Sequence, residues 1–217
     1  IHLSLSHVEG GGTALLMQDV TAAQAAEASR RQFSANVSHE LRTPLTTISG
    51  YAELLSSGML QKSEDATEFG RKILAESRRL LTLIEDIIRL SRLDEGVRGE
   101  VTPVDLTALV QHCVQKLTPA AQNAQVSISA SGNDPVLISG DHALLEEMLT
   151  NLLENGIKYN HAGGYVRARA EMADEHAVVT VADNGVGIAP EDQQRVFERF
   201  YRVDKSRSKQ TGGTGLG

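Results

Sequence analysis

Apolar residues recur at helical spacing in two long stretches of the first half of the chain. The first stretch places them every three, four or seven residues, which lines them up on one side of a helix, and the second stretch forms a similar stripe. Gly58 and Gly96 end the two stretches. The pattern predicts two amphipathic helices that form an antiparallel hairpin. The first stripe contains Phe33, Val37, Leu41, Leu45, Ile48 and Leu55, and the second contains Phe69, Ile73, Leu80, Ile84, Ile87 and Leu93.

The apolar stripe of such a hairpin needs a partner, because two helices alone leave much of it in water. A second copy of the chain can cover it, so we expect a homodimer whose two hairpins form a four-helix bundle. Packing of the hairpin on the rest of the same chain is the alternative.

The pattern changes on both sides of the hairpin. Residues 1–19 alternate apolar and polar positions around three glycines at 10–12, which predicts a β-hairpin. Beyond Gly96, short helices and strands follow one another, which indicates a separate α+β domain that begins near residues 96–103. The expected elements are a helix at 104–117, strands at 126–130 and 136–138, a helix at 141–159, and two antiparallel strands at 166–172 and 177–182.

Composition narrows the classes of function. The chain carries 21 basic and 28 acidic residues, a net charge of −7, which argues against a nucleic-acid partner. Aromatic residues make up 4% and Trp is absent, so Leu, Ile, Val and Ala must build the core. The single cysteine, Cys113, allows no internal disulfide and no cysteine-rich zinc site. No apolar run approaches the roughly 18 residues of a membrane span.

One histidine of the first predicted helix stands apart from its apolar stripe. His39 lies two residues from Val37 and from Leu41, and a turn of about 100° per residue directs its imidazole away from them. Glu40 is adjacent, Thr43 follows one turn later on nearly the same face, and Pro44 predicts a local bend. A nucleophile, a base and a hydroxyl group are thus close together. An ordinary exposed histidine near a kink is the alternative.

Polar residues in the second domain suit a nucleotide. Asn151, Asn155, Lys158 and Tyr159 are spaced to share one side of a helix. Amide oxygens are ligands for Mg²⁺, lysine binds phosphate, and an aromatic ring can cover a base. The capped end of a polar helix explains the same residues without a ligand.

Two glycine-rich segments follow, at 183–188 and 212–217, with a basic run at 195–209 between them. Glycine lets the backbone approach a ligand closely, and a surplus of positive charge suits an anion. A turn, a linker and a solvated loop are the alternatives.

These segments carry a resemblance to bacterial two-component sensor histidine kinases. Residues 33–45 (FSANVSHELRTPL) resemble the phosphoacceptor box of that family. Residues 151–159, 183–188, 195–209 and 212–217 resemble, in order, the N, G1, F and G2 boxes of its ATP-binding domain. The resemblance implies a helical dimerisation hairpin followed by a Bergerat-type (GHKL) α/β sandwich. It implies the activity of an ATP:protein-L-histidine phosphotransferase with ATP and Mg²⁺. The phosphate-sensor and cell-wall-sensor kinases are the most similar subgroups.

The resemblance also implies a role for each matching residue. His39 accepts the phosphoryl group, Glu40 acts as base or orients the histidine, and Thr43 supports dephosphorylation of the partner regulator. Asn155, assisted by Asn151, holds Mg²⁺; Lys158 and Arg202 contact phosphates, Tyr159 the base, and Asp183 the adenine amino group. The lid glycines are Gly185, Gly187, Gly213, Gly215 and Gly217, with Phe197 and Phe200 packed beneath the lid.

The implied organisation has three parts. Residues 1–21 are the end of a PAS-like sensor module, 22–98 the dimerisation and phosphotransfer domain, and 99–217 the catalytic ATP-binding domain. Because the family continues beyond the last glycine box, we expect that domain to be C-terminally incomplete. The expected partner is the receiver domain of a response regulator. The segment is expected on the cytoplasmic side of a bacterial membrane, which it meets only through residues outside this sequence. A scaffold that binds ATP without transferring phosphate, and a protein that acts mainly as a phosphatase, are the rival functions.

Overall fold

The computed structural model describes residues 2–8, 12–57, 63–96, 99–203 and 215–216. The chain divides into two compact units, Ile1–Ile84 and Glu85–Gly217. Among the described residues, no helix is long and apolar enough to cross a bilayer.

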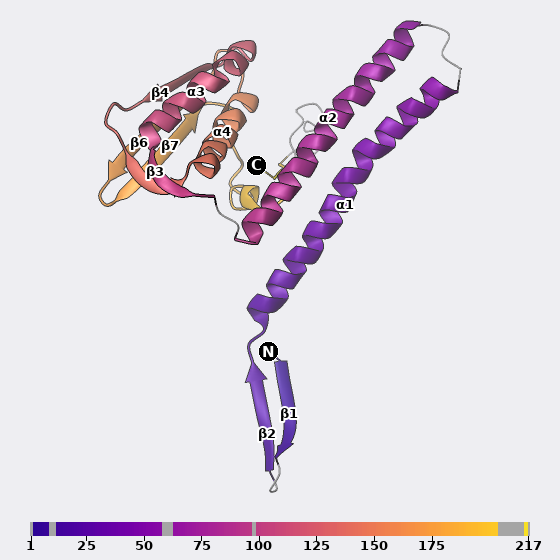
Figure 1. Ribbon diagram of the computed structural model, residues 1–217, viewed down its shortest axis with the longest axis vertical. Coiled ribbons are helices and arrows are strands. Elements are labelled where there is room, and N and C mark those ends of the chain that lie inside the picture. The colour runs from indigo at the N-terminus through magenta and orange to yellow at the C-terminus, as the bar shows by residue number, and fades with distance from the viewer. Residues whose placement is uncertain (1, 9–11, 58–62, 97–98, 204–214, 217) are drawn as a thin grey trace. The chain divides into compact units, whose positions relative to one another are not determined.

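The first unit contains a β-hairpin and the two long helices (Figure 1). Strands β1 (His2–Val8) and β2 (Gly12–Gln18) pair antiparallel. Helices α1 (Thr21–Ser56) and α2 (Ser63–Asp94) follow, and α2 continues into the second unit. The rings of Tyr51 in α1 and Phe69 in α2 stack with their centroids 5.3 Å apart. Both predicted hairpins, the β-hairpin and the helical one, are confirmed.

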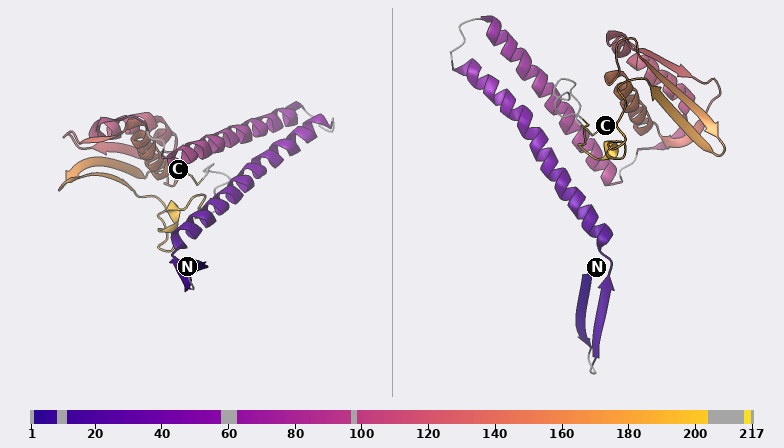
Figure 2. Two further views of the ribbon diagram at one scale, coloured as in Figure 1. Left: turned by 60° about the horizontal axis from the view of Figure 1, so that its bottom comes forward. Right: turned by 180° about the vertical axis from the view of Figure 1, so that it is seen from behind.

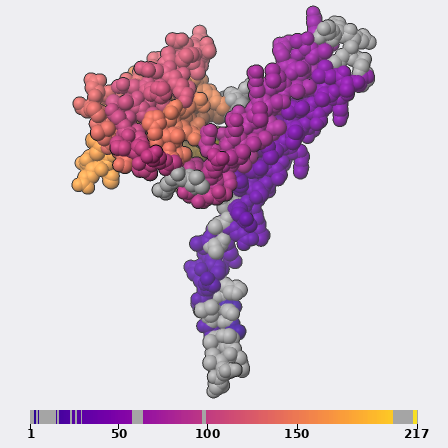
Figure 3. Space-filling view, in the orientation of Figure 1, coloured from indigo at the N-terminus to yellow at the C-terminus, as the bar shows by residue number. Residues whose placement is uncertain are grey.

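The two helices leave much apolar surface uncovered. In this unit Leu83 is only 4% exposed, whereas the stripe residues Leu45 and Ile84 are 50% and 38% exposed. In Figure 3 these helices form an elongated part of the visible surface. Helix α1 continues through Pro44, whose side chain is buried. A single copy of the chain therefore does not satisfy the apolar stripe of its hairpin.

The second unit packs helices on one face of a mixed sheet, as the edge-on view in Figure 2 shows. Strand β6 pairs parallel with β4 and antiparallel with β7, and β3 pairs antiparallel with β5. This arrangement confirms the predicted fold class, a helical hairpin followed by an α/β sandwich. The elements are β3 (Val101–Asp105), α3 (Leu106–Asn123), β4 (Ser127–Ser131), β5 (Leu137–Asp141), α4 (His142–Lys158), β6 (Tyr165–Ala173), β7 (His176–Asp183) and a short 3₁₀ helix, η1 (Arg195–Phe197).

The prediction for residues 104–117 is wrong at its start. Val104 and Asp105 end strand β3, and the helix begins at Leu106 and continues to Asn123. The carboxylate of Asp105 explains the boundary, because it accepts hydrogen bonds from the backbone N–H groups of Thr107 and Ala108 (2.9 and 3.3 Å). An aspartate in this position caps the helix N-terminus and stops the helix from extending backwards.

Helix α4 begins in the same way. Asp141 ends β5, and its Oδ1 accepts from the N–H groups of Ala143 and Leu144 at 3.0 and 3.2 Å. Its Oδ2 accepts from the N–H of Gly99 at 2.7 Å. The bonds from Leu144, Gly99 and Ala143 lower the pKa of this carboxyl. Each strand of the two-stranded sheet thus ends in the cap of the helix that follows it.

The core lies between α3, α4 and the inner face of the sheet. Along β6, Val166, Ala168 and Ala170 are buried while Arg167 and Arg169 point to water, as the predicted alternation requires. Leu149 and Leu153 of α4 are fully buried. Cys113 is also fully buried in this core. Burial raises the pKa of its thiol, which keeps the thiol protonated and unreactive.

Truncation of the α4 core is expected to destabilise this unit. Leu153→Ala should lower the free energy of unfolding by about 2–5 kcal/mol, because it leaves a cavity between the helix and the sheet. Leu152→Ala, one residue away and 45% exposed, should cost less than about 1 kcal/mol. Urea unfolding followed by circular dichroism measures both, and equal losses would contradict the described core.

Candidate functional site

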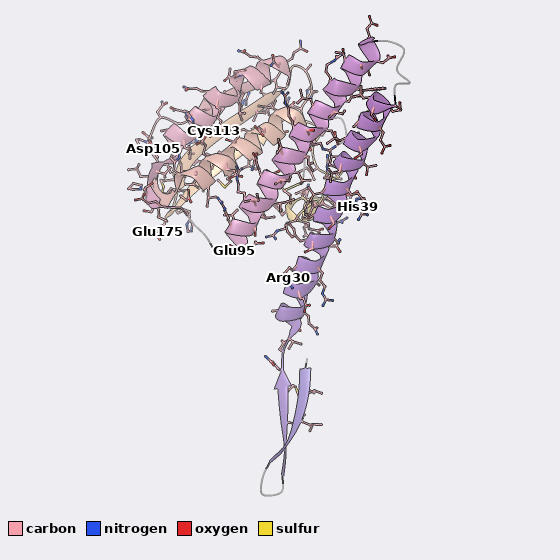
Figure 4. The ribbon with its side chains drawn as sticks, turned by 45° about the vertical axis from the view of Figure 1, so that its right-hand side comes forward. Arg30, His39, Glu95, Asp105, Cys113 and Glu175 are labelled. Carbon is pink, nitrogen blue, oxygen red and sulfur yellow. The ribbon has the colours of Figure 1, made fainter. Side chains whose placement is uncertain are left out.

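The predicted phosphoacceptor is accessible on α1. His39 is exposed in the central part of the helix (Figure 4). Thr43, one turn later, is also exposed, and its hydroxyl donates to the backbone carbonyl of His39 at 3.3 Å. Glu40 is half-buried. An incoming substrate can therefore reach the imidazole without any rearrangement of this unit.

The predicted nucleotide residues of α4 lie along its last turns. Asn155 is exposed, and the Lys158 ammonium lies 5.3 Å from the ring centroid of Tyr159. Asn151 is half-buried and lines a shallow cleft with Lys116 and Glu154. The lysine, the aromatic ring and Asn155 are thus grouped at the C-terminal end of α4.

The turn after β7 meets this end of α4. Gly185 donates its N–H to Asp183 Oδ1 at 2.8 Å, and Val186 donates its N–H to the carbonyl of Tyr159 at 3.0 Å. A Cβ atom at Gly185 would overlap that carbonyl oxygen, so only glycine allows the approach. The structure therefore brings Asp183 and its turn together with Tyr159.

The remaining predicted site residues are only partly described. Gly187 and Gly215 have positive φ angles of 71° and 70°. The carbonyl of Gly215 accepts from the N–H of Phe200 at 2.7 Å. Arg202 is half-buried. Gly213 and Gly217 lie outside the described residues.

Several residues of the basic run serve the local fold. The Arg195 guanidinium lies 4.1 Å from the ring centroid of Tyr201, whose hydroxyl donates to Asp192. Arg199 forms two hydrogen bonds with Asp94, at 2.6 and 2.8 Å, and they lower the pKa of that carboxyl. Arg195 and Arg199, which the sequence suggested as ligands for an anion, thus make contacts within the protein.

Phe197, expected to pack beneath the lid, is 89% exposed, and residues 204–214 of the lid segment lie outside the described residues. Phe197 ends η1, and the chain becomes extended at Glu198. Phe200, by contrast, is half-buried.

Two asparagines with extensive contacts were not predicted as site residues. Asn160 follows the end of α4, and Asn184 follows Asp183. Their side chains hydrogen-bond the backbone of Tyr165 at the start of β6. An asparagine directly after a helix and another in an Asp-Asn-Gly turn are signals of such backbone bonding.

The residues present fit a nucleotide-bound magnesium ion better than a metal site made by protein alone. Within the described ranges, no group of three or more His, Cys, Asp or Glu residues could hold a metal. Asn155 offers a single exposed amide oxygen. A Mg²⁺ ion that takes phosphate oxygens and water as its other ligands needs no more from the protein.

Comparison with known proteins decides the family. The profile of the His Kinase A (phospho-acceptor) domain matches residues 29–96, and that of the histidine kinase-, DNA gyrase B- and HSP90-like ATPases matches residues 140–217. The chain belongs to the two-component sensor histidine kinase family. His39 lies within the first match and Asp183 within the second, so this histidine kinase has its predicted site residues inside family domains.

Individual histidine kinases resemble this one along most of its length. It is 41% identical over 192 residues to the sensor-like histidine kinase SenX3 of Mycobacterium tuberculosis, covering 88% of this chain and 47% of SenX3. It is 36% identical to the phosphate regulon sensor protein PhoR of Pseudomonas aeruginosa, covering 94% of this chain and 46% of PhoR. The chain thus spans about half the length of these relatives. Among solved structures, the histidine kinase AdeS of Acinetobacter baumannii matches with a TM-score of 0.64 and 26% identity, covering 82% of each chain.

The close approach at Gly185 makes a specific prediction for this histidine kinase. Gly185→Ala should weaken Mg-ATP binding by at least about tenfold, because the added methyl pushes the turn away from Tyr159. Gly70→Ala, where an added Cβ meets nothing within 4 Å, is the control and should leave the affinity unchanged. Isothermal titration calorimetry measures both. Wild-type affinity in Gly185→Ala would show that the contact does not shape the nucleotide site.

Proposed function

We propose that this chain is the ATP:protein-L-histidine phosphotransferase core of a two-component sensor. It phosphorylates His39 from Mg-ATP and then transfers the phosphoryl group to an aspartate in the receiver domain of a response regulator. One observation carries the proposal: Tyr159 at the end of α4 meets the turn that begins at Asp183, inside a domain that matches ATPases.

The end of α4 and this turn would bind the nucleotide. Asp183 is exposed at the end of β7, where its carboxylate can accept from the adenine amino group. Tyr159 is placed to cover the base, and Lys158 to contact the phosphates together with Arg202. Asn155, assisted by Asn151, would hold Mg²⁺, which offsets the charge of the phosphates. The lid would use Gly185, Gly187, Gly213, Gly215 and Gly217.

Transfer to His39 requires only that the γ-phosphoryl group reach an exposed imidazole. A ring nitrogen attacks the γ-phosphorus in line, and the bond from that phosphorus to the oxygen of the leaving ADP breaks. Glu40, the next residue, takes up the imidazole proton as base or orients the ring. His39 belongs to the first unit and the nucleotide residues to the second. The γ-phosphate must therefore come within reach of His39 for each transfer, and positioning supplies most of the catalysis.

The uncovered apolar surface of the hairpin supports a homodimer. Large side chains that should be buried remain exposed in one copy of the chain, and two hairpins in a four-helix bundle would cover them. These side chains are Leu45, Leu54, Leu74, Leu81 and Ile84.

The predicted domain limits complete the proposal. Residues 22–98 would form the dimerisation and phosphotransfer domain and 99–217 the ATP-binding domain, with 1–21 ending a PAS-like sensor module. The chain would lie on the cytoplasmic side of a bacterial membrane, where ATP and the response regulator are found. Thr43, one turn beyond His39, would support dephosphorylation of the regulator.

A phosphorylation assay tests the proposed function. With γ-labelled ATP, the wild-type chain should acquire an acid-labile label, and His39→Ala should reduce it to background because the accepting nitrogen is gone. His112→Ala, which removes an exposed histidine of α3, is the control and should keep the label. Label that persists in His39→Ala would refute the assignment. An unlabelled wild type that still binds Mg-ATP would favour the ATP-binding scaffold.

A further inference from the structure

Two asparagine side chains meet over one glycine between α4 and the sheet. Asn160 Nδ2 donates to the carbonyls of Gly156 and Tyr165, at 3.1 and 3.0 Å. Asn184 Oδ1 accepts from the N–H of Tyr165 at 2.6 Å. Gly164 is buried between them: a Cβ there would overlap Asn160 Oδ1 and lie 3.0 Å from Asn184 Oδ1. We name Asn160, Gly164 and Asn184 the asparagine junction.

The asparagine junction connects the two segments that the proposed nucleotide site requires. Asn160 bonds the last turn of α4 to the first residue of β6, through the carbonyls of Gly156 and Tyr165. Asn184 bonds that same Tyr165 to the turn after β7. Tyr165 is in turn anchored in the sheet, because it pairs with Ser127 of β4. Hydrogen bonds to the backbone of Tyr165 therefore hold both the end of α4 and the turn after β7 in place.

We propose that Asn160 and Asn184 are positioning residues for the nucleotide: they fix the spacing between the α4 residues Asn155, Lys158 and Tyr159 and the turn that contains Asp183. The inference rests on the proposed function. It adds residues that touch no substrate and act through the backbone of Tyr165. A misplacement of either segment separates groups that must contact the same ATP molecule, so nucleotide affinity responds as well as stability.

The chemistry of Asn160 gives a sharp variant. Its amide nitrogen donates to two carbonyl oxygens, whereas its Oδ1 accepts from the N–H of His161 at 2.9 Å. Asn160→Asp keeps the size and that acceptor but turns a carboxylate oxygen toward the two carbonyls. Both hydrogen bonds become repulsive contacts. Asn123→Asp makes the same chemical change at an exposed position at the end of α3 and serves as the matched control.

Titration calorimetry with Mg-ATP, well below the unfolding midpoint of each variant, tests the proposal. Asn160→Asp should bind at least about tenfold more weakly than wild type, and Asn123→Asp should stay within about twofold. In autophosphorylation assays the KM for ATP should rise more than kcat falls. A merely structural role would lower the unfolding midpoint and leave the affinity of the folded protein unchanged, and that result would overturn the proposal.

A second pair of variants keeps the test decisive where Asn160→Asp does not fold. Gly164→Ala should displace the Asn160 side chain and weaken Mg-ATP binding. In an Asn160→Ala background the same substitution should cost clearly less than in the wild type, because the overlap with Asn160 is gone and only the 3.0 Å contact with Asn184 Oδ1 remains. Additive losses would overturn the junction.

Asp183→Asn separates this proposal from the proposed function. It should abolish most Mg-ATP binding whatever the asparagine junction does. If the wild type binds, Asp183→Asn does not, and the junction variants bind like wild type, only the junction fails. If the wild type does not bind or Asp183→Asn binds equally well, the nucleotide site and the junction both fail.

Discussion

The second unit depends on the contact between the last turn of α4 and the ends of two strands. The Tyr159 carbonyl accepts the N–H of Val186, and one residue later Asn160 bonds to the start of β6. Helix and sheet must lie this close for a lysine, an aromatic ring and a carboxylate to converge from two distant parts of the sequence. The buried leucines of α4 hold the helix on the sheet, and Gly185 makes room for the carbonyl of Tyr159.

The two units differ in structure in a way that matches their proposed roles. The nucleotide unit has a closed core and capped helices, so it can hold several groups in fixed relation to one another. The helical unit exposes His39 and leaves apolar surface for a second copy. In the proposed reaction, binding and orientation belong to one unit, and the nucleophile belongs to the other. Bringing the γ-phosphate to His39 is then a step that a signal can control.

Periodicity was sufficient to predict most of the fold and insufficient for the contacts that align the site. The stripe from Phe33 to Leu55 and the alternation along β6 are strong signals, because burial on one face imposes them. Strand β3 was not predicted, because Pro103 weakens its strand pattern. The helix start was placed too early, because Asp105, which caps α3, lies within an apolar stretch. The packing expected for Phe197 beneath the lid stays a prediction, since residues 204–214 lie outside the described residues. The hydrogen bonds of Asn160 and Asn184 are made to backbone atoms, so the pattern of residue types does not predict them.

Amide hydrogen exchange, measured with and without Mg-ATP, tests the central claim most directly: that the end of α4 and the turn after β7 form one nucleotide site. Slower exchange upon ATP addition should be concentrated in residues 151–165 and 183–188, because the ligand stabilises both segments together. Helix α3, which contributes none of the predicted nucleotide residues, should change less than these segments. Protection of only one of the two segments, or protection confined to α3, would contradict the account.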